Sequence, residues 1–267
     1  MRKTSIIFTV LCLPLLFAGT ADAFLGIGQK TETNGMGMEF VQIPAGSFFR
    51  EINIVNDFNE KLYSPKVIVS KPFFLGKYEV TQEQWMTVMG NNPSSFKGRK
   101  NPVESVSWDD VQEFIKRLNA REGTNRYRLP TEAEWELAAR GGTDTMFFFM
   151  KNPETFEEVA RPLGDYAWFL ENAGGATHPV GEKKPNPYGL YDIYGNVWEW
   201  VQDWYTEKLP TDREITDYRG PAQGSLRVVR GGGWSSLAEY CRSGDRRSNA
   251  PVNRDDRMGF RLAFSPE

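Results

Sequence analysis

Thiols and imidazoles are the side chains best suited to bind soft transition metals, and this sequence of 267 residues has two cysteines and one histidine. Cys12 lies in an apolar N-terminal segment, which leaves Cys241 and His178 in the rest of the chain. One thiol cannot form an internal disulfide, and one imidazole cannot build a histidine-rich metal centre. We expect Cys241 to be a buried small residue, with an intermolecular disulfide or a reactive thiol as alternatives. His178 is expected to be a hydrogen-bonded structural residue.

A pair of carboxylates offers a different chemistry. Asp192 and Glu199 stand seven residues apart on a segment that contains Gly195. Two carboxylates, with backbone carbonyls between them, can supply the oxygen-rich shell that Ca²⁺ prefers. The spacing therefore indicates a structural calcium site. The alternative is that Glu199 only accepts hydrogen bonds from backbone amides in a turn.

Aromatic rings and guanidinium groups near the C-terminal part of the chain could line a pocket. Trp198, Trp234, Arg242 and Arg246 are the candidates, because these groups suit peptide or aromatic ligands. Both tryptophans could equally be core residues, since tryptophan is highly buried on average.

The N-terminal residues have the features of a secretory signal peptide. Arg2 and Lys3 precede an apolar run over residues 5–18 and the small-residue triplet Ala21-Asp22-Ala23. We expect residues 1–23 to be removed, residues 24–36 to be a mobile N-terminal arm, and residues 37–267 to form one domain. The predicted location is periplasmic or secreted.

The charge of the chain excludes several classes of partner. The net charge is −3, with 32 Lys+Arg against 35 Asp+Glu, so no basic field is present to attract nucleic acid. After the signal, no stretch approaches about 20 consecutive apolar residues, so no membrane insertion is expected after cleavage. The motifs of phosphate loops, zinc sites and serine hydrolases are not found.

Three helices and several short strands must position these groups. Capping-box patterns predict amphipathic surface helices that begin after Thr81, Ser107 and Thr131. Short strands are expected within residues 38–49, 67–80, 226–229 and 259–264, and residues 142–227 lack periodicity. With 18 Phe, 10 Tyr and 8 Trp, the sequence predicts a loop-rich fold with an aromatic core.

Several phrases, spread in order over the chain after the predicted signal, resemble one family. They are Met38-Glu39-Phe40, Glu79-Val80-Thr81, Pro102-Val103-Glu104-Ser105-Val106-Ser107-Trp108, Arg128-Leu129-Pro130-Thr131-Glu132, Asn186-Pro187-Tyr188-Gly189-Leu190, Gly195-Asn196-Val197-Trp198-Glu199-Trp200, Arg230-Gly231-Gly232-Gly233-Trp234 and Gly259-Phe260-Arg261. Together they resemble the formylglycine-generating enzyme (sulfatase-modifying factor) superfamily. The resemblance implies an α+β fold, a loop-rich variant of the C-type-lectin-like fold with a small antiparallel sheet and a few helices. It also implies calcium ligation by the side chains of Asp192 and Glu199 and by the carbonyls of Gly195 and Val197.

The chain departs from this superfamily where the family enzymes carry two catalytic cysteines. Counted from the three glycines, Ser236 stands at the first cysteine position and Cys241 at the second, while the loop up to Gly259 is shorter than in the family. A serine hydroxyl is a poor substitute for a thiolate ligand of Cu(I). Catalytic residues therefore stay unassigned, with Cys241, Ser236 and Tyr240 as candidates, and a role for copper or iron stays open.

These observations lead us to expect an exported accessory or maturation factor that acts on a peptide or an exported protein client. It would lack the standard two-cysteine copper site, like the siderophore-maturation branch of the superfamily. One alternative is a non-enzymatic, C-type-lectin-like ligand-binding module such as a variable protein. A second alternative is a formylglycine-generating oxidase that uses Cys241 alone. Fold alone cannot choose among them.

Overall fold

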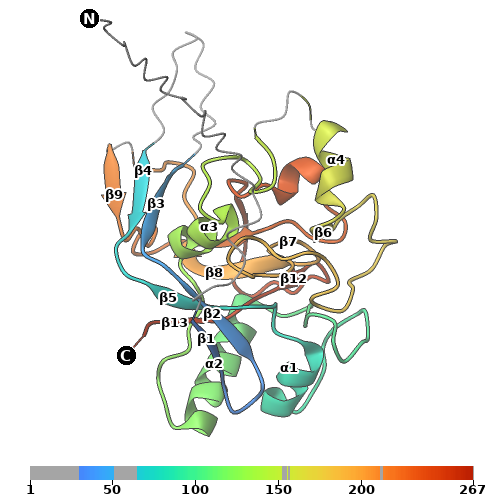
Figure 1. Ribbon diagram of the computed structural model, residues 1–267. Helices are drawn as coiled ribbons and strands as arrows, with labels where there is room; N and C mark the ends of the chain where they lie inside the picture. The colour runs from blue at the N-terminus through green and yellow to red at the C-terminus, as the bar shows by residue number, and fades with distance from the viewer. Residues whose placement is uncertain (1–29, 51–64, 152–154, 156, 211–212, 267) are drawn as a thin grey trace, which may run out of the picture.

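The computed structural model describes residues 30–50, 65–151, 155, 157–210 and 213–266. The predicted signal peptide and residues 24–29 lie outside this described part. Figure 1 shows α1 and α2 at one end of the molecule, α4 at the opposite end, and β8 between them. The helices are α1 (Gln82–Met89), α2 (Trp108–Glu122), α3 (Glu132–Arg140) and α4 (Glu157–Leu163), with a 3₁₀ turn, η1 (Ala238–Cys241). The strands are β1 (Thr31–Thr33), β2 (Glu39–Ile43), β3 (Gly46–Phe49), β4 (Lys66–Val69), β5 (Phe73–Gly76), β6 (Ala167–Trp168), β7 (Tyr194–Gly195), β8 (Trp198–Trp204), β9 (Glu214–Thr216), β10 (Arg227–Arg230), β11 (Arg247–Asn249), β12 (Met258–Gly259) and β13 (Ala263–Phe264).

The three predicted helix starts are confirmed. Thr81, Ser107 and Thr131 are N-caps, and in each helix both hydrogen bonds of the capping box are formed. Each of the three helices ends at a glycine in the left-handed conformation, where a side chain would be strained. The local sequence therefore fixes both ends of α1, α2 and α3.

Four small sheets make up the strand part of the described chain. Their strand orders are β1-β2-β5-β13, β11-β10-β8-β12, β3-β4-β9 and β6-β7. The pairs β8–β12, β4–β9 and β6–β7 are parallel and the others are antiparallel. The predicted loop-rich α+β class is confirmed, although the strands are divided among several sheets and are not all antiparallel.

Two segments differ from the prediction. Residues 31–33, assigned to a mobile arm, form β1 and pair with Glu39–Val41 of β2. Asn34 closes the connecting turn, because its side-chain oxygen accepts from the backbone N–H of Met36 and of Met38. The seven-residue strand β8 lies inside the region without periodicity. Most of its residues are buried, so the alternation typical of a half-exposed strand is absent.

Helix α3 is a core helix, and its prediction as an amphipathic surface helix is wrong. Eight of its nine residues are buried, including Glu132, Glu136 and Arg140. These charged side chains are paired inside the protein, which is the condition for burying them. The core also carries many aromatic contacts, such as the stacked pair of Trp85 and Phe114 at 5.2 Å between ring centres. None of the helices in the described ranges has the length and apolar character that crossing a membrane requires.

Candidate functional site

A pocket of about 580 Å³ opens where the start of β8, the turn η1 and the strands β10, β11 and β12 come together. Its volume lies in the range of small-ligand sites, roughly 300–1,000 Å³. Its wall combines aromatic and apolar side chains with hydroxyls and two arginines. The lining residues are Trp198, Val229, Ser235, Ser236, Leu237, Tyr240, Arg247, Ser248, Asn249, Arg257 and Met258.

Three of the residues singled out from the sequence line this pocket, namely Trp198, Ser236 and Tyr240. Trp234 does not line it. Its indole Nε1 donates to the carbonyl oxygen of Asp256 at 3.1 Å, and its ring packs edge-on against Phe96. Trp234 therefore supports the loop that precedes β12 and does not contribute to the lining, so its assignment to the pocket is corrected.

The arginine assignments are also corrected. Arg246 points inward and pairs with Glu132, whereas its neighbour Arg247 lines the pocket. Successive side chains of an extended chain point to opposite sides, so a shift of one residue exchanges the inner and the outer arginine. Arg242 contacts Asp245 at 3.3 Å and the carbonyl oxygen of Glu239, away from the lining.

Among the lining residues that sequence reasoning missed, Arg247 and Arg257 carry a charge. Arg257 directly precedes β12, and its guanidinium forms a bidentate ion pair with Asp255. The alternation in β11 could have indicated Arg247, but only with the register of that strand in hand.

Ser236 is held by its own turn. Its hydroxyl accepts from the backbone N–H of Gly233 at 2.9 Å, and the Ser236 N–H donates to the carbonyl of Gly233. The described lining residues include no carboxylate, imidazole or thiol. A side-chain base that could activate the hydroxyl of Ser236 or Tyr240 as a nucleophile is therefore missing from the described wall.

Cys241 lies beneath Gly232 of the glycine loop (residues 231–233) and outside the pocket lining. Its side chain is fully buried, and its sulfur contacts the carbonyl oxygen of Leu237 at 3.8 Å. Burial raises the pKa of the Cys241 thiol far above its usual range, and the nearby charge of Asp245 adds to this. A Cβ atom at Gly232 would lie 2.6 Å from the sulfur, so no side chain fits between the thiol and the loop.

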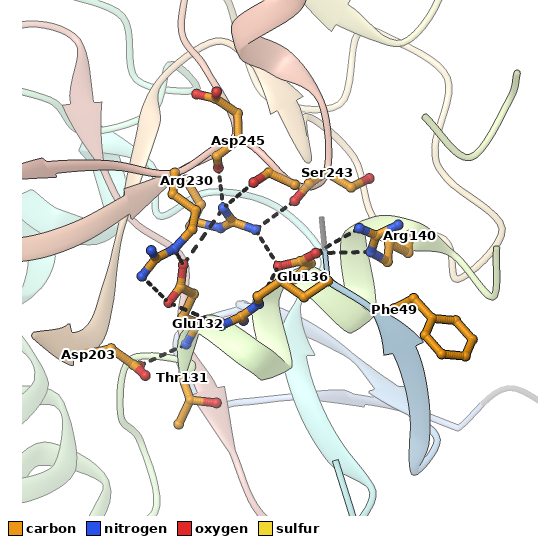
Figure 2. A network of polar contacts seen from close by, with 12 residues as sticks. Phe49, Thr131, Glu132, Glu136, Arg140, Asp203, Arg230, Ser243 and Asp245 are labelled. Carbon is orange, nitrogen blue, oxygen red and sulfur yellow. Dashed lines mark hydrogen bonds and ion pairs between the residues drawn. The ribbon is translucent and has the colours of Figure 1, made fainter. Parts of the chain in front are cut away.

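A buried network of ion pairs connects α3 with Arg230 and with the segment 243–245 (Figure 2). Arg230 of β10 donates to Glu136 of α3 at 2.9 Å and to the carbonyl oxygen of Ser243 at 2.6 Å. The same guanidinium also reaches the carbonyl oxygen of Asp245. Arg230 thus fixes residues 243–245, the segment that leads into β11, against the central helix.

The charges of α3 depend on this network. Burial alone would raise the pKa of Glu132, but Arg50, Arg246 and Arg230 outweigh it and lower that pKa to about 2. Asp203 behaves in the opposite way. Burial, and then the charge of Glu132, raise its pKa to about 7. Asp203 accepts the backbone N–H of Glu132 at 2.8 Å through one oxygen, and the other is buried without a partner in the described chain.

The residues expected to bind calcium lie together, but Glu199 has other partners. Both of its oxygens are 2.8 Å from Nε of Arg261, and Oε2 also accepts from the indole of Trp135 at 2.7 Å. A guanidinium this close would repel a cation, so the ligand role expected for the Glu199 side chain does not match the geometry. Its alternative role as an acceptor of backbone amides does not match either.

Asp192 differs from Glu199 in having one carboxylate oxygen that a cation could bind. Its Oδ2 accepts from the N–H of Gly181 at 2.7 Å, whereas Oδ1 is buried without a partner among the described residues. Burial, together with the charge of Glu199, raises the pKa of Asp192 to about 6. The turn that follows curls tightly, since Asp192, Gly195 and Asn196 all have positive φ. The unpartnered oxygen of Asp192 could bind Ca²⁺ with the carbonyls of Gly195 and Val197.

His178 has structural contacts, as expected. Its ring stacks on Trp168 at 3.7 Å between ring centres, and its Nε2 lies 2.8 Å from the carbonyl oxygen of Ala173. The backbone N–H of His178 donates to Asn196 in the curled turn.

Comparison with known proteins places these features in a family. A model of the sulfatase-modifying factor enzyme 1-like domain matches residues 28–266. The chaperone protein LppX of Paenibacillus barcinonensis is 38% identical over 216 residues, which cover 65% of this chain and 73% of that protein. The formylglycine-generating enzyme of Thermomonospora curvata is 35% identical over 196 residues, or 68% of this chain and 61% of the enzyme. The chain thus spans less than two thirds of the length of that enzyme.

Among solved structures, Treponema denticola variable protein 1 has a TM-score of 0.75 and 36% identity, and the match covers 90% of this chain and 100% of that one. The family match over nearly the whole described chain agrees with the resemblance found in the sequence motifs. The chain belongs to the sulfatase-modifying factor enzyme 1-like family.

Proposed function

We propose that this chain is an exported accessory or maturation factor that binds a peptide or an exported protein client in the pocket beside β8. The observation that carries the proposal is the placement of two residues. Ser236 lines the pocket at the position that resembles the first catalytic cysteine of the family, and Cys241 is buried beneath Gly232. The pocket has the features of a binding site and lacks the thiol pair.

The copper chemistry of the formylglycine-generating enzymes fits these residues poorly. Two thiolates are the soft ligands that suit Cu(I), and the hydroxyl of Ser236 is a hard group. The remaining thiol, Cys241, has a raised pKa and no exposed surface, whereas reactive cysteines are partly exposed and have lowered pKa values. Neither a two-thiol nor a one-thiol oxidase is favoured.

Two further observations support an accessory role outside the cytoplasm. The relative from Paenibacillus barcinonensis is named a chaperone protein, which describes action on another protein. The N-terminal residues of the sequence have the charge and apolar pattern of a secretory signal, which supports a periplasmic or secreted location. A client met after export is consistent with both.

An aldehyde assay tests the enzymatic alternative. The purified chain, loaded with Cu(I), is incubated with a Cys-x-Pro-x-Arg peptide, and the product is analysed by mass spectrometry. We expect no formylglycine, whereas the Thermomonospora curvata enzyme in the same buffer should produce it. Aldehyde that forms with this chain and disappears in Cys241→Ala would show that the oxidase alternative is correct.

Site-specific crosslinking tests the client-binding proposal. A photo-crosslinking amino acid replaces Leu237 at the pocket or, as a control, Met86 on α1; the two side chains are 44% and 46% exposed. Illumination in the source cells should give discrete protein or peptide adducts at Leu237 and none at Met86. Identical adduct patterns at the two positions, or no adduct at Leu237, would contradict the proposal.

A non-enzymatic ligand-binding module is the second candidate. Variable protein 1 of Treponema denticola matches 90% of this chain at 36% identity, and most of the pocket wall comes from the segment 235–258. A reverse-transcriptase gene near this gene, with a near-identical template copy of the segment, would favour this candidate. A gene neighbourhood without them favours a dedicated client.

Calcium has a structural role in this proposal. The ion would be held by Asp192, through the oxygen that has no partner in the described chain, and by carbonyls of the curled turn. It would offset negative charge at this turn, since burial and then the carboxylates of Asp192 and Glu199 raise the pKa of Glu79 well above its usual range.

A further inference from the structure

The charged side chains that line the pocket are both arginines. The described lining contains Arg247 and Arg257 and no aspartate or glutamate. Both guanidiniums are about half exposed, at 50% and 49%. Arg257 is paired with Asp255, whereas Arg247 makes one long contact, 3.4 Å from Nε to Asp245. The terminal nitrogens of Arg247 have no protein acceptor in the described structure.

Arg247 is held in place although it is only weakly paired. Its guanidinium lies over the ring of Tyr240, 4.4 Å from the ring centre. Such stacking orients the planar group while leaving its outer N–H donors free for a ligand. Asp245 neutralises it incompletely, because that carboxylate also contacts Arg242 at 3.3 Å. A guanidinium whose N–H donors are oriented and have no protein acceptor is suited to bidentate binding of a carboxylate.

Apolar surface adjoins this cation. Trp198, Val229 and Met258 form part of the wall, and Leu237 is 44% exposed at its edge. The backbone N–H of Leu170 donates to the carbonyl oxygen of Ser236, which places Leu170, 51% exposed, next to the same turn. Leu237 and Leu170 therefore expose apolar side chains in and next to the turn that lines the pocket.

We propose that the pocket selects a peptide segment that carries a carboxylate next to an apolar side chain. Arg247 binds the carboxylate, and the apolar side chain packs on the surface that Leu237 and Leu170 provide. The inference rests on the proposed client-binding function and names the chemical class of the client. A peptide with an arginine at this position, as in Cys-x-Pro-x-Arg, would instead meet a like charge.

Peptide titrations test this selectivity. The purified chain is titrated calorimetrically with the amidated peptide acetyl-Gly-Leu-Glu-Leu-Gly, with versions that carry Gln or Lys in place of Glu, and with acetyl-Gly-Leu-Gly that ends in a free carboxylate. We expect the Glu peptide to bind at least about 10-fold more tightly than the Gln peptide, with the Lys peptide weakest, because a charged hydrogen-bond pair is lost. The free-acid peptide shows whether a terminal carboxylate is an equivalent source.

Two arginine variants assign the effect to the pocket. Arg247→Gln should abolish the preference for Glu over Gln, and Arg247→Lys should keep only part of it, since lysine lacks the planar fork. Arg254→Gln makes the same charge change on a side chain that is 57% exposed and does not line the pocket, so the preference should persist.

The result separates this inference from the proposed function. Equal affinity for the Glu and Gln peptides, no binding of any peptide, or equal losses in Arg247→Gln and Arg254→Gln would each overturn carboxylate selection. Adducts at Leu237 in the crosslinking experiment would still support client binding in those cases. Unchanged thermal unfolding of Arg247→Gln confirms that a lost preference is not a folding defect.

Discussion

Single residues in the glycine loop decide how close the chain can approach its own core. Gly232 has a φ of 80°, and a Cβ there would lie 2.6 Å from the sulfur of Cys241 and 3.1 Å from its Cα. The sequence motif identifies the glycines, but only the structure shows what lies beneath them. Cys241 is thus explained by packing, in agreement with the buried role expected from the sequence.

Replacing Gly232 with alanine should destabilise the protein beyond the usual cost of a positive φ. Gly90 is the matched control, because its φ is 81° and a Cβ added there would meet no atom of the surrounding structure within 4 Å. We expect Gly90→Ala to cost about 1 kcal/mol and Gly232→Ala roughly 2–4 kcal/mol, from strain plus overpacking. Urea unfolding of both variants measures the difference.

A double variant identifies the clash. Cys241→Ala removes the sulfur, so Gly232→Ala should cost less in that background, although the backbone of residue 241 still crowds the site. Equal costs of Gly232→Ala and Gly90→Ala would show that the loop moves freely away from the thiol.

At the scale of elements, α3 is a charged helix placed inside the molecule. Glu136 accepts from Arg140 at 2.8 Å and from Arg230 at 2.9 Å, and all three side chains are buried. The ion pairs are expected to fix the positions of these side chains more than to raise the free energy of unfolding, because desolvation offsets much of their attraction. They also affect the pocket, since Arg230 donates to the carbonyl oxygen of Ser243 and so positions the segment that leads to Arg247 (Figure 2).

Removing one charge of this network should be strongly destabilising. Glu136→Gln removes one of the two buried carboxylates that Arg50 and Arg230 share, and we expect a loss of about 3–5 kcal/mol in the free energy of unfolding. Glu113 and Arg117 on α2 form the same i,i+4 pair at 2.8 Å, but at the surface. Glu113→Gln should therefore leave stability unchanged within error. Similar losses in the two variants, measured by chemical unfolding, would contradict this account.

At the scale of the whole molecule, buried carboxylates make stability depend on pH in two opposite directions. The pKa of Glu132 is lowered from 4.5 to about 2, so its contribution is present above pH 4.5 and is lost as the pH falls through about 2. The pKa of Asp203 is raised from 3.8 to about 7. The folded state then binds more protons than the unfolded state between these two values, so stability falls as the pH rises from about 4 to about 7.

Asp203→Asn should reduce this second dependence, to which Asp192, with its pKa raised to about 6, also contributes. The amide oxygen can still accept the N–H of Glu132, but the charge is gone, so stability at pH 8 should rise relative to the parent chain. Each pKa unit corresponds to about 1.4 kcal/mol, and a rise of a few kcal/mol is therefore the upper range. Thermal unfolding across the pH series measures it. Asp165→Asn, at an exposed ion pair, is the control and should keep the parental slope between pH 4 and pH 7.

Calcium should stabilise the fold through Asp192. Binding to the folded state alone raises the unfolding free energy by about 2.7 kcal/mol when the free ion is at 100 times its Kd. We expect the melting temperature to rise with millimolar Ca²⁺, to fall with chelator, and to respond little in Asp192→Asn. The nearby Glu182→Gln should respond like the parent chain. A melting temperature that ignores both Ca²⁺ and chelator would show that no such site forms.

Much of the fold could be predicted from local chemistry. The caps at Thr81, Ser107 and Thr131 depend on residues three positions apart, so the sequence determined where three helices begin. Signals that depend on one-sided exposure failed at β8 and α3, because both elements are buried on nearly all sides. The family was also evident from the sequence, since its motifs are contiguous and occur in order.

The site was predicted only in part. Sequence alone determined that the thiol pair is incomplete, and it identified Trp198, Ser236 and Tyr240. Tertiary structure decided which arginine lines the pocket, because Arg246 pairs with Glu132 on a distant helix and the next side chain, Arg247, points to the opposite side. It also decided the contacts of Glu199, which pairs with Arg261, 62 residues away in sequence. Pairings between remote segments depend on packing of the whole chain, and no local pattern records them.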